Sequence, residues 1–152
     1  KYPLVFFVGF VLDQLLKSWA VKTLDFYEGL VILPKLLSFQ LVYNHGAAYG
    51  IFQNQKLFLS TVAILFVVLT FIFRRHFISS EWSKWGLVFI YIGAIGNLWD
   101  RVTLGYVVDF INIHIIPVFN LADISINIGV LFFFIEIFIL KNDKTGKLSD
   151  PA

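Results

Sequence analysis

The stretch GYVVDFINIHIIPVFNLAD (Gly105–Asp123) separates two long apolar runs of the chain. Between Asp109 and Asp123 it contains no acid or base other than His114. Ionisable side chains beside a lipid bilayer are costly, and those that are retained are mostly functional. The two carboxylates therefore make this stretch the first candidate for a functional site.

The composition is typical of an integral membrane protein. Of the 152 residues, 59% are hydrophobic and 14% are charged, and the mean hydropathy is +0.81. A soluble domain carries about a quarter charged residues. The formal net charge is only +2, and the basic residues lie at the ends of apolar runs, so we expect no nucleic-acid partner. The chain contains no cysteine, which excludes disulfides, thiolate nucleophiles and cysteine metal sites.

Four apolar runs are long enough to cross a bilayer, which takes roughly 17–25 residues per helix. They cover about residues 2–21, 57–73, 85–101 and 123–140. The third run is short in its uncharged part, so we expect it to extend on either side. The predicted fold is an all-α membrane protein with four transmembrane helices in a single domain, residues 1–152.

The distribution of basic residues predicts the orientation of these helices. Arg74, Arg75 and Lys84 lie in or beside the short second connection, and further lysines lie in the tail 141–152. Basic loops remain on the cytoplasmic side. Both termini are then cytoplasmic, and the outer segments cover about 22–56 and 102–122.

The first outer segment is not an empty linker. Its sequence VILPKLLSFQLVYNHGAAYGIF (residues 31–52) has β-branched and aromatic residues in partial alternation, followed by a Gly/Ala cluster. This pattern predicts short strands with a turn. We therefore expect a small β-structure on the outer surface of the membrane.

Polar residues near the apolar runs form further candidates. Asp13 and Lys17 are four residues apart and share one helix face. They form either an ion pair that orients the helix or a contact to a substrate or catalytic network. Asn44 and Gly46 belong to NHGAAYG, which forms either a simple turn or a place where another backbone approaches closely.

The motif GAIGNLWDR closes the third run and carries Asn97, Asp100 and Arg101. These side chains are either interfacial anchors or part of a site. Because Asp100 and Arg101 are adjacent on a helix, they point in different directions, and we expect them to have separate partners.

Two interpretations of Asp109 and Asp123 remain open at this point. Asp123 lies where the fourth helix should begin, so it could cap that helix, and Asp109 could be a solvated loop acid. If the two acids meet, they cannot both ionise easily and will share a proton. That is the aspartic-protease arrangement, in which one carboxylate activates water and the other polarises the scissile carbonyl.

Other chemistries lack their motifs. The sequence has no HExxH, no GxSxG and no phosphate-binding glycine loop, and its three histidines lack metal-ligand spacing. We therefore expect no metal and no cofactor. Most polar groups gather at one side of the predicted membrane, whereas a transporter would place them at the midplane.

Five motifs, taken together, resemble those of the lipoprotein signal peptidases, the bacterial type II signal peptidases. The motifs DQLLK, NHGAAYG, GAIGNLWDR, GYVVDF and FNLAD occur in the family's order across nearly the whole chain. Ile92 stands where many members have glycine, and Tyr49 stands where phenylalanine or tryptophan is common. The resemblance implies four transmembrane helices with a small β-structure and a short helix on the outer, periplasmic side.

The resemblance also implies roles for individual residues. It makes Asp109 and Asp123 the catalytic pair and places Asp13 and Lys17 in a supporting polar network. The residues that it implies shape the site and hold substrate are Asn44, Gly46, Asn97, Asp100, Arg101, Asn120 and Ala122.

The implied reaction is hydrolysis of a diacylglyceryl-modified prolipoprotein just before its lipidated cysteine. The resemblance further implies a multi-pass protein of the bacterial inner membrane, surrounded by lipids and inhibited by globomycin-type compounds; we expect a monomer. The alternative is a non-enzymatic small membrane protein for transport or assembly, whose polar cluster binds a partner. Such a protein would have no need for both acids.

Overall fold

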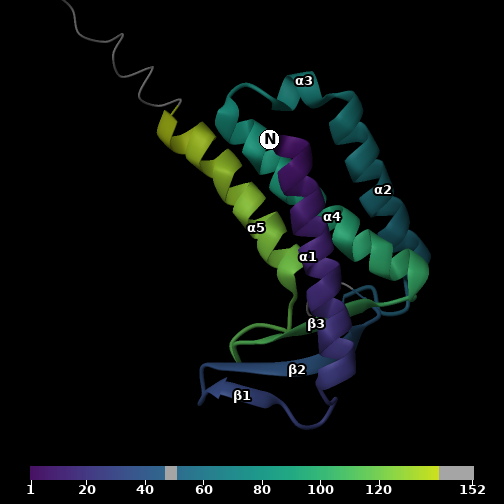
Figure 1. Cartoon of the computed structure of the whole chain (residues 1–152). Helices are drawn as coiled ribbons and strands as arrows, with labels where there is room; N and C mark the ends of the chain where they lie inside the picture. Colours follow the sequence, from purple (N-terminus) through teal and green to yellow (C-terminus); the bar gives the residue numbers. More distant parts are fainter. Residues whose placement is uncertain (47–50, 141–152) are drawn as a thin grey trace, which may run out of the picture.

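The computed structural model describes residues 1–46 and 51–140 and shows long helices packed on one side of a small sheet (Figure 1). The elements in chain order are α1 (Tyr2–Thr23), β1 (Leu30–Leu33), β2 (Leu37–Asn44), α2 (Lys56–Ile72), α3 (Arg74–Phe77), α4 (Glu81–Thr103), β3 (Val107–Asn112), α5 (Leu121–Phe134) and the π-helical segment η2 (Ile135–Leu140). The predicted tail 141–152 and Tyr49 lie outside the described residues.

The long helices coincide with the apolar runs of the sequence. Among the described residues, the segments Tyr2–Thr23 and Leu121–Phe138 are long and apolar enough to cross a membrane. Helix α2 is shorter, with 17 residues. Helix α4 extends beyond the predicted 85–101 at both ends, since Ser80 caps its first turn by accepting hydrogen bonds from the backbone N–H groups that follow.

The sheet is three-stranded and antiparallel, in the order β1-β2-β3. Its register pairs Val42 with Asp109 and Asn44 with Val107. The sequence predicted strands in residues 31–52, where β1 and β2 lie, but not β3. Because the first four residues of β3 are buried, its sequence VVDFIN lacks the alternation that marks a half-exposed strand.

One apolar cluster fastens the sheet to the end of α1. Ala20 and Leu24 pack with Leu41 of β2 and with Val108 and Phe110 of β3. The side chains on either side of Asp109 are thereby fixed in the core. The position of that acid therefore depends on packing between segments far apart in the sequence.

Helices α4 and α5 approach each other closely where α5 begins. A methyl group on Gly93 would overlap the backbone carbonyl of Ala122. Small residues allow helix backbones to pack at such short range. This contact holds the first turn of α5, and hence Asp123, against α4.

The short helix expected on the sheet side is not found within residues 1–46 and 51–140. The short helix of the described structure is α3, which connects α2 to α4 at the opposite end of the molecule from the sheet (Figure 1). Its sequence RRHF is basic. The expectation from the resemblance is therefore not met in the described part of the chain.

Candidate active site

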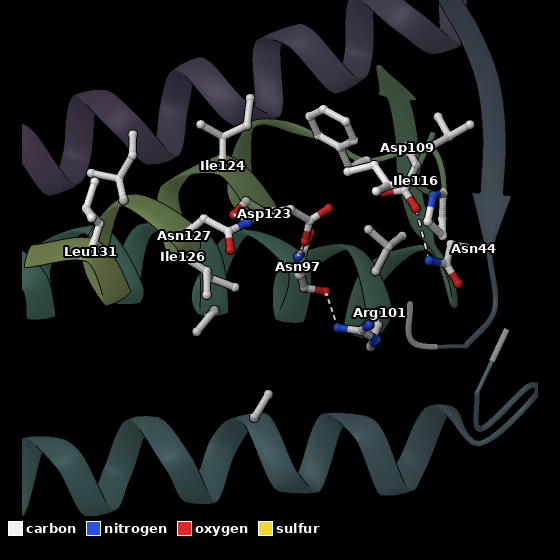
Figure 2. Close-up of a pocket in the computed structure, with 17 residues that line it drawn as sticks. Asn44, Asn97, Arg101, Asp109, Ile116, Asp123, Ile124, Ile126, Asn127 and Leu131 are labelled. Carbon is white, nitrogen blue, oxygen red and sulfur yellow. Dashed lines mark hydrogen bonds between the residues drawn. The ribbon is translucent and has the colours of Figure 1, made fainter. Parts of the chain in front are cut away.

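The structure brings Asp109 and Asp123 to the same cavity, which has a volume of about 740 Å³ (Figure 2). Asp109 lies in the middle of β3, and Asp123 lies in the first turn of α5. The remaining wall comes from β2, α2, α4 and the loop before α5. The question that the sequence left open, whether the two acids face one site, is thus answered by the fold.

Asp109 is buried and accepts hydrogen bonds from two amides. Its side chain is 2% exposed. Its Oδ1 accepts from Asn120 Nδ2 at 2.7 Å, and its Oδ2 accepts from Asn44 Nδ2 at 3.0 Å. Both donors are neutral, so no cation in these contacts compensates a charge on Asp109.

Asp123 caps α5 and also lines the cavity. It belongs to a capping box, in which the Asp123 backbone N–H donates to Asn120 Oδ1 and the Asn120 N–H donates back to Asp123 Oδ2. Its other oxygen, Oδ1, accepts from Asn97 Nδ2 at 2.8 Å. Capping therefore fixes the carboxylate at the cavity wall and does not withdraw it from the site.

The orientation of both buried amides follows from their partners. Asn120 Oδ1 accepts from Asp123, so Asn120 Nδ2 must face Asp109 and Asn97 Oδ1. Asn97 Oδ1 also accepts from Lys17 Nζ at 3.1 Å. Because an ammonium group only donates, Lys17 turns the Asn97 carbonyl toward itself and the amide N–H toward Asp123.

A buried ionic layer lies behind these amides. Lys17 Nζ is 2.9 Å from Asp13 Oδ2 and 3.0 Å from Asp100 Oδ2, and all three side chains are at most 3% exposed. Asp13 Oδ1 accepts from the Ala122 N–H, and Asp100 Oδ2 accepts from the Val108 N–H. The layer therefore holds the start of α5 and the middle of β3 together.

Gln14 is a member of this layer that the sequence analysis missed. Its Nε2 lies 3.1 Å from both Asp13 Oδ2 and Asp100 Oδ1. One lysine carries a single positive charge for two carboxylates, and the Gln14 amide adds donors to both. The signal was present, because Gln14 is an uncharged polar residue inside the first apolar run.

Arg101 and Asp100 have separate partners, as their adjacency predicted. Arg101 donates to the carbonyls of Gly46, at 3.2 Å, and Asn97, at 3.5 Å, and lines the cavity. In the described chain, no ion pair within 4 Å joins Arg101 to a carboxylate. The guanidinium thus ties Gly46, which follows β2 closely in the chain, to the end of α4.

The electrostatics of the cavity favour a neutral Asp109. Burial raises the pKa of Asp109 to about 7, and the nearby charge of Asp123 acts in the same direction. The hydrogen bonds from Asn44 and Asn120 favour the ionised form and oppose the shift. Among the described residues, the cavity included, no group of three or more His, Cys, Asp or Glu side chains is placed to hold a metal ion.

The fold of this chain is similar to those of solved bacterial membrane enzymes. One of them, determined by the in meso method, superposes with a TM-score of 0.84 over 99% of this chain and 93% of its own, at 28% identity. A second superposes with a TM-score of 0.79 over 91% of this chain and 92% of its own. The fold therefore places the chain among membrane enzymes.

Sequence comparison gives the family. Residues 5–139 match the family model for signal peptidase (SPase) II. The chain is 36% identical to a lipoprotein signal peptidase of Clostridium novyi over 93% of its length and 98% of the relative's. It is 34% identical to one of Pseudomonas aeruginosa over 91% of its length and 86% of the relative's. The chain belongs to the signal peptidase II family, which is a family of membrane peptidases.

Proposed function

We propose that this protein removes signal peptides from prolipoproteins as an aspartic endopeptidase, with Asp109 and Asp123 as its catalytic pair. The observation that carries the proposal is their placement on one cavity wall, where each accepts amide hydrogen bonds and, within residues 1–46 and 51–140, neither forms an ion pair. Membership in the signal peptidase II family supports the reaction. The aspartic chemistry is inferred from the geometry.

In this mechanism the two acids have different roles, because one holds a proton and the other does not. Because burial raises the pKa of Asp109 to about 7, Asp109 is the acid that we assign to hold a proton near neutral pH, and we assign the carboxylate that activates water to Asp123. The ionised carboxylate takes a proton from a water molecule, whose oxygen attacks the scissile carbonyl carbon. The protonated carboxyl donates a hydrogen bond to the carbonyl oxygen, and a proton then passes to the leaving amine as the C–N bond breaks.

The neighbouring amides hold the two acids in position without adding a positive charge beside them. Asn97 and Asn120 each donate to one acid of the pair, and Asn44 holds the outer oxygen of Asp109. We propose that Arg101 and Gly46 bound the substrate channel, since Arg101 donates to the Gly46 carbonyl beside the cavity. These neutral donors orient the acids, while proton sharing remains possible.

The substrate that best fits the cavity is a diacylglyceryl-modified prolipoprotein, cut just before the lipidated cysteine. Polar residues surround the acid pair, whereas the wall along α5 is apolar, with Ile124, Ile128 and Leu131. An acyl chain is accommodated by such a wall, and the peptide by the polar part. No cofactor is part of this proposal.

We further propose a multi-pass arrangement in the bacterial inner membrane. The four apolar helical segments would be the spans, with both termini cytoplasmic and the acid pair toward the periplasmic face. Basic residues of α3 lie at the end opposite the sheet, which supports this orientation. The resemblance further suggests a monomer surrounded by membrane lipids and inhibition by globomycin-type compounds.

A non-enzymatic transport or assembly role is not favoured by the family membership. A direct test is a gel-shift cleavage assay on purified protein in detergent, with a diacylglyceryl-modified prolipoprotein and an unmodified one as substrates. We expect cleavage of the lipidated substrate alone. A well-folded protein that cleaves neither would contradict the proposal and favour the binding role.

A further inference from the structure

Asn127 is a polar residue of the cavity that the proposed chemistry does not use. It lies on α5 one helical turn after Asp123, and its side chain is exposed along the cavity that holds the acid pair (Figure 2). One turn of helix places it about 6 Å further from the sheet. Polar groups at membrane depth are costly, so this asparagine calls for an explanation.

Its hydrogen bonds leave it with unused capacity to donate. Asn127 Nδ2 donates to the backbone carbonyl of Asp123 at 2.9 Å. That contact also fixes the amide orientation, because a carbonyl can only accept. An amide nitrogen carries two protons, so a second one remains for a group in the cavity.

The surroundings of Asn127 are apolar and spacious. The cavity wall around this part of α5 includes Ala63 of α2, Ala94 of α4, and Ile128 and Leu131 of α5 itself. The two alanines leave room between the helices, and the α5 side chains offer contacts to hydrocarbon. Among the described lining residues of α5, Asn127 is the polar one that follows Asp123.

We propose that Asn127 recognises the lipid of the substrate by donating a hydrogen bond from Nδ2 to an ester carbonyl of the diacylglyceryl group. This inference rests on the proposed function. In a diacylglyceryl cysteine, about eight bonds of ~1.5 Å separate the scissile carbonyl from an ester carbonyl, a reach of up to roughly 10 Å. The one-turn offset between Asp123 and Asn127 lies within that reach.

The chemistry of the two groups is complementary. The thioether and the two esters of a diacylglyceryl cysteine offer acceptors but no donor, so a side chain that hydrogen-bonds to this lipid must donate. Beyond Asn127 along α5, the apolar wall with Ile128 and Leu131 accommodates the acyl chains. The residue thus marks the boundary between the polar part of the cavity, which holds the peptide, and the apolar part.

The competing explanation is purely structural, namely that Asn127 only bonds back to its own helix. Ser125 provides the matched control, because its Oγ donates to the Leu121 carbonyl in the same four-residue pattern but the side chain is not part of the cavity wall. If back-bonding is the only role of such residues, Asn127→Leu and Ser125→Ala will have similar effects.

The experiment compares two synthetic substrates that differ only in the lipid linkage. One carries the ordinary diester, and the other carries a diether of the same chain length, which lacks the carbonyl acceptors. Wild-type protein, Asn127→Leu, Asn127→Ala and Ser125→Ala are assayed for kcat and KM in the same detergent, with thermal unfolding measured for each. Asn127→Ala is included in case the leucine variant does not fold.

For the diester we expect Asn127→Leu and Asn127→Ala to lower kcat/KM about five- to tenfold, mostly through KM, because one hydrogen bond to bound substrate is lost. For the diether, wild type and both variants should be equal. An equal loss on both substrates, or no loss on the diester, would overturn the inference while leaving the acid pair intact. Absence of cleavage by wild type on every substrate would overturn the proposed function and the inference with it.

Discussion

The described structure holds two pairs of carboxylates, three of them buried and Asp123 half-buried, and the partners of the two pairs differ. Asp13 and Asp100 are held within 3.0 Å of the Lys17 ammonium, whose single positive charge they share. Asp109 and Asp123 receive hydrogen bonds from the amides of Asn120 and Asn97, and no ion pair within 4 Å joins either acid to another described residue. The first pair is a structural layer, and the second forms the candidate active site.

The difference lies in the charge of the groups that contact each carboxylate. A cation beside a carboxylate favours the ionised form. Neutral amides orient a carboxylate but leave part of the burial cost, and that cost raises the pKa of Asp109 to about 7. The two layers are joined through Asn97, whose Oδ1 faces Lys17 and whose Nδ2 faces Asp123.

The strongest test of the comparison removes the acids of the second layer. Asp109→Asn and Asp123→Asn should each lower cleavage by at least about a thousandfold, because proton transfer to and from the reacting groups is lost. The fold should remain, since an amide retains much of the hydrogen bonding. The gel-shift assay measures turnover, and Asp25→Asn, an exposed acid outside both layers, serves as the control. Normal turnover of a folded Asp123→Asn variant would refute the catalytic assignment.

The structural layer should respond through stability. Lys17→Met leaves Asp13 and Asp100 buried without their cation, so we expect unfolding to become easier by about 3–5 kcal/mol. Thermal unfolding in detergent measures the loss. Lys22→Met, an exposed lysine on the same helix, should change little. If the two lysine variants are equally stable, the ion pairs of Lys17 do not stabilise the fold, and the structural role of this layer is refuted.

The pKa of Asp109 predicts a pH dependence for the reactive layer. Its folded value of about 7 lies above the ordinary 3.8, so the proton required for catalysis is present at lower pH and lost as the pH rises through 7. Between about pH 4 and 7 the native state binds more protons than the unfolded chain, so the free energy of unfolding should fall with rising pH. Activity should decline above pH 7. A rate that still rises between pH 7 and 9 would contradict this assignment.

The smallest predicted effect concerns Asn44, whose amide donates a hydrogen bond to Asp109 Oδ2. The hydrogen bond from Asn44 lowers the pKa of Asp109, so Asn44→Ala should raise it and move the alkaline decline of activity upward by up to about one pH unit. The readout is the full pH profile of kcat/KM. Asn112→Ala is the matched control, because Asn112 lies on the same sheet but bonds to Gln40. A shift to lower pH in Asn44→Ala would mean that the hydrogen bond does not favour the ionised acid.

Parts of the fold were predictable because their signals are local. Apolar runs predicted the long helices, although α4 extends beyond the predicted 85–101 at both ends. Strands were predicted in residues 31–52, where β1 and β2 lie. The strand β3 was missed because burial removes the alternation of VVDFIN, and Gln14 was missed because its role exists only when Asp13 and Asp100 face each other.

By itself, the sequence determined the class of protein and the chemical inventory: a membrane protein with two acids, Asp109 and Asp123, set in apolar sequence. Whether those acids meet was decided by tertiary structure. One lies on a strand held by the core cluster around Val108, and the other lies on a helix docked at Gly93, so their approach depends on packing between distant segments. Tertiary structure also places Lys17 beside Asp13 and Asp100, and places amide side chains beside Asp109 and Asp123. The sequence lists the acids, but only their neighbours in space determine which of them keeps its proton.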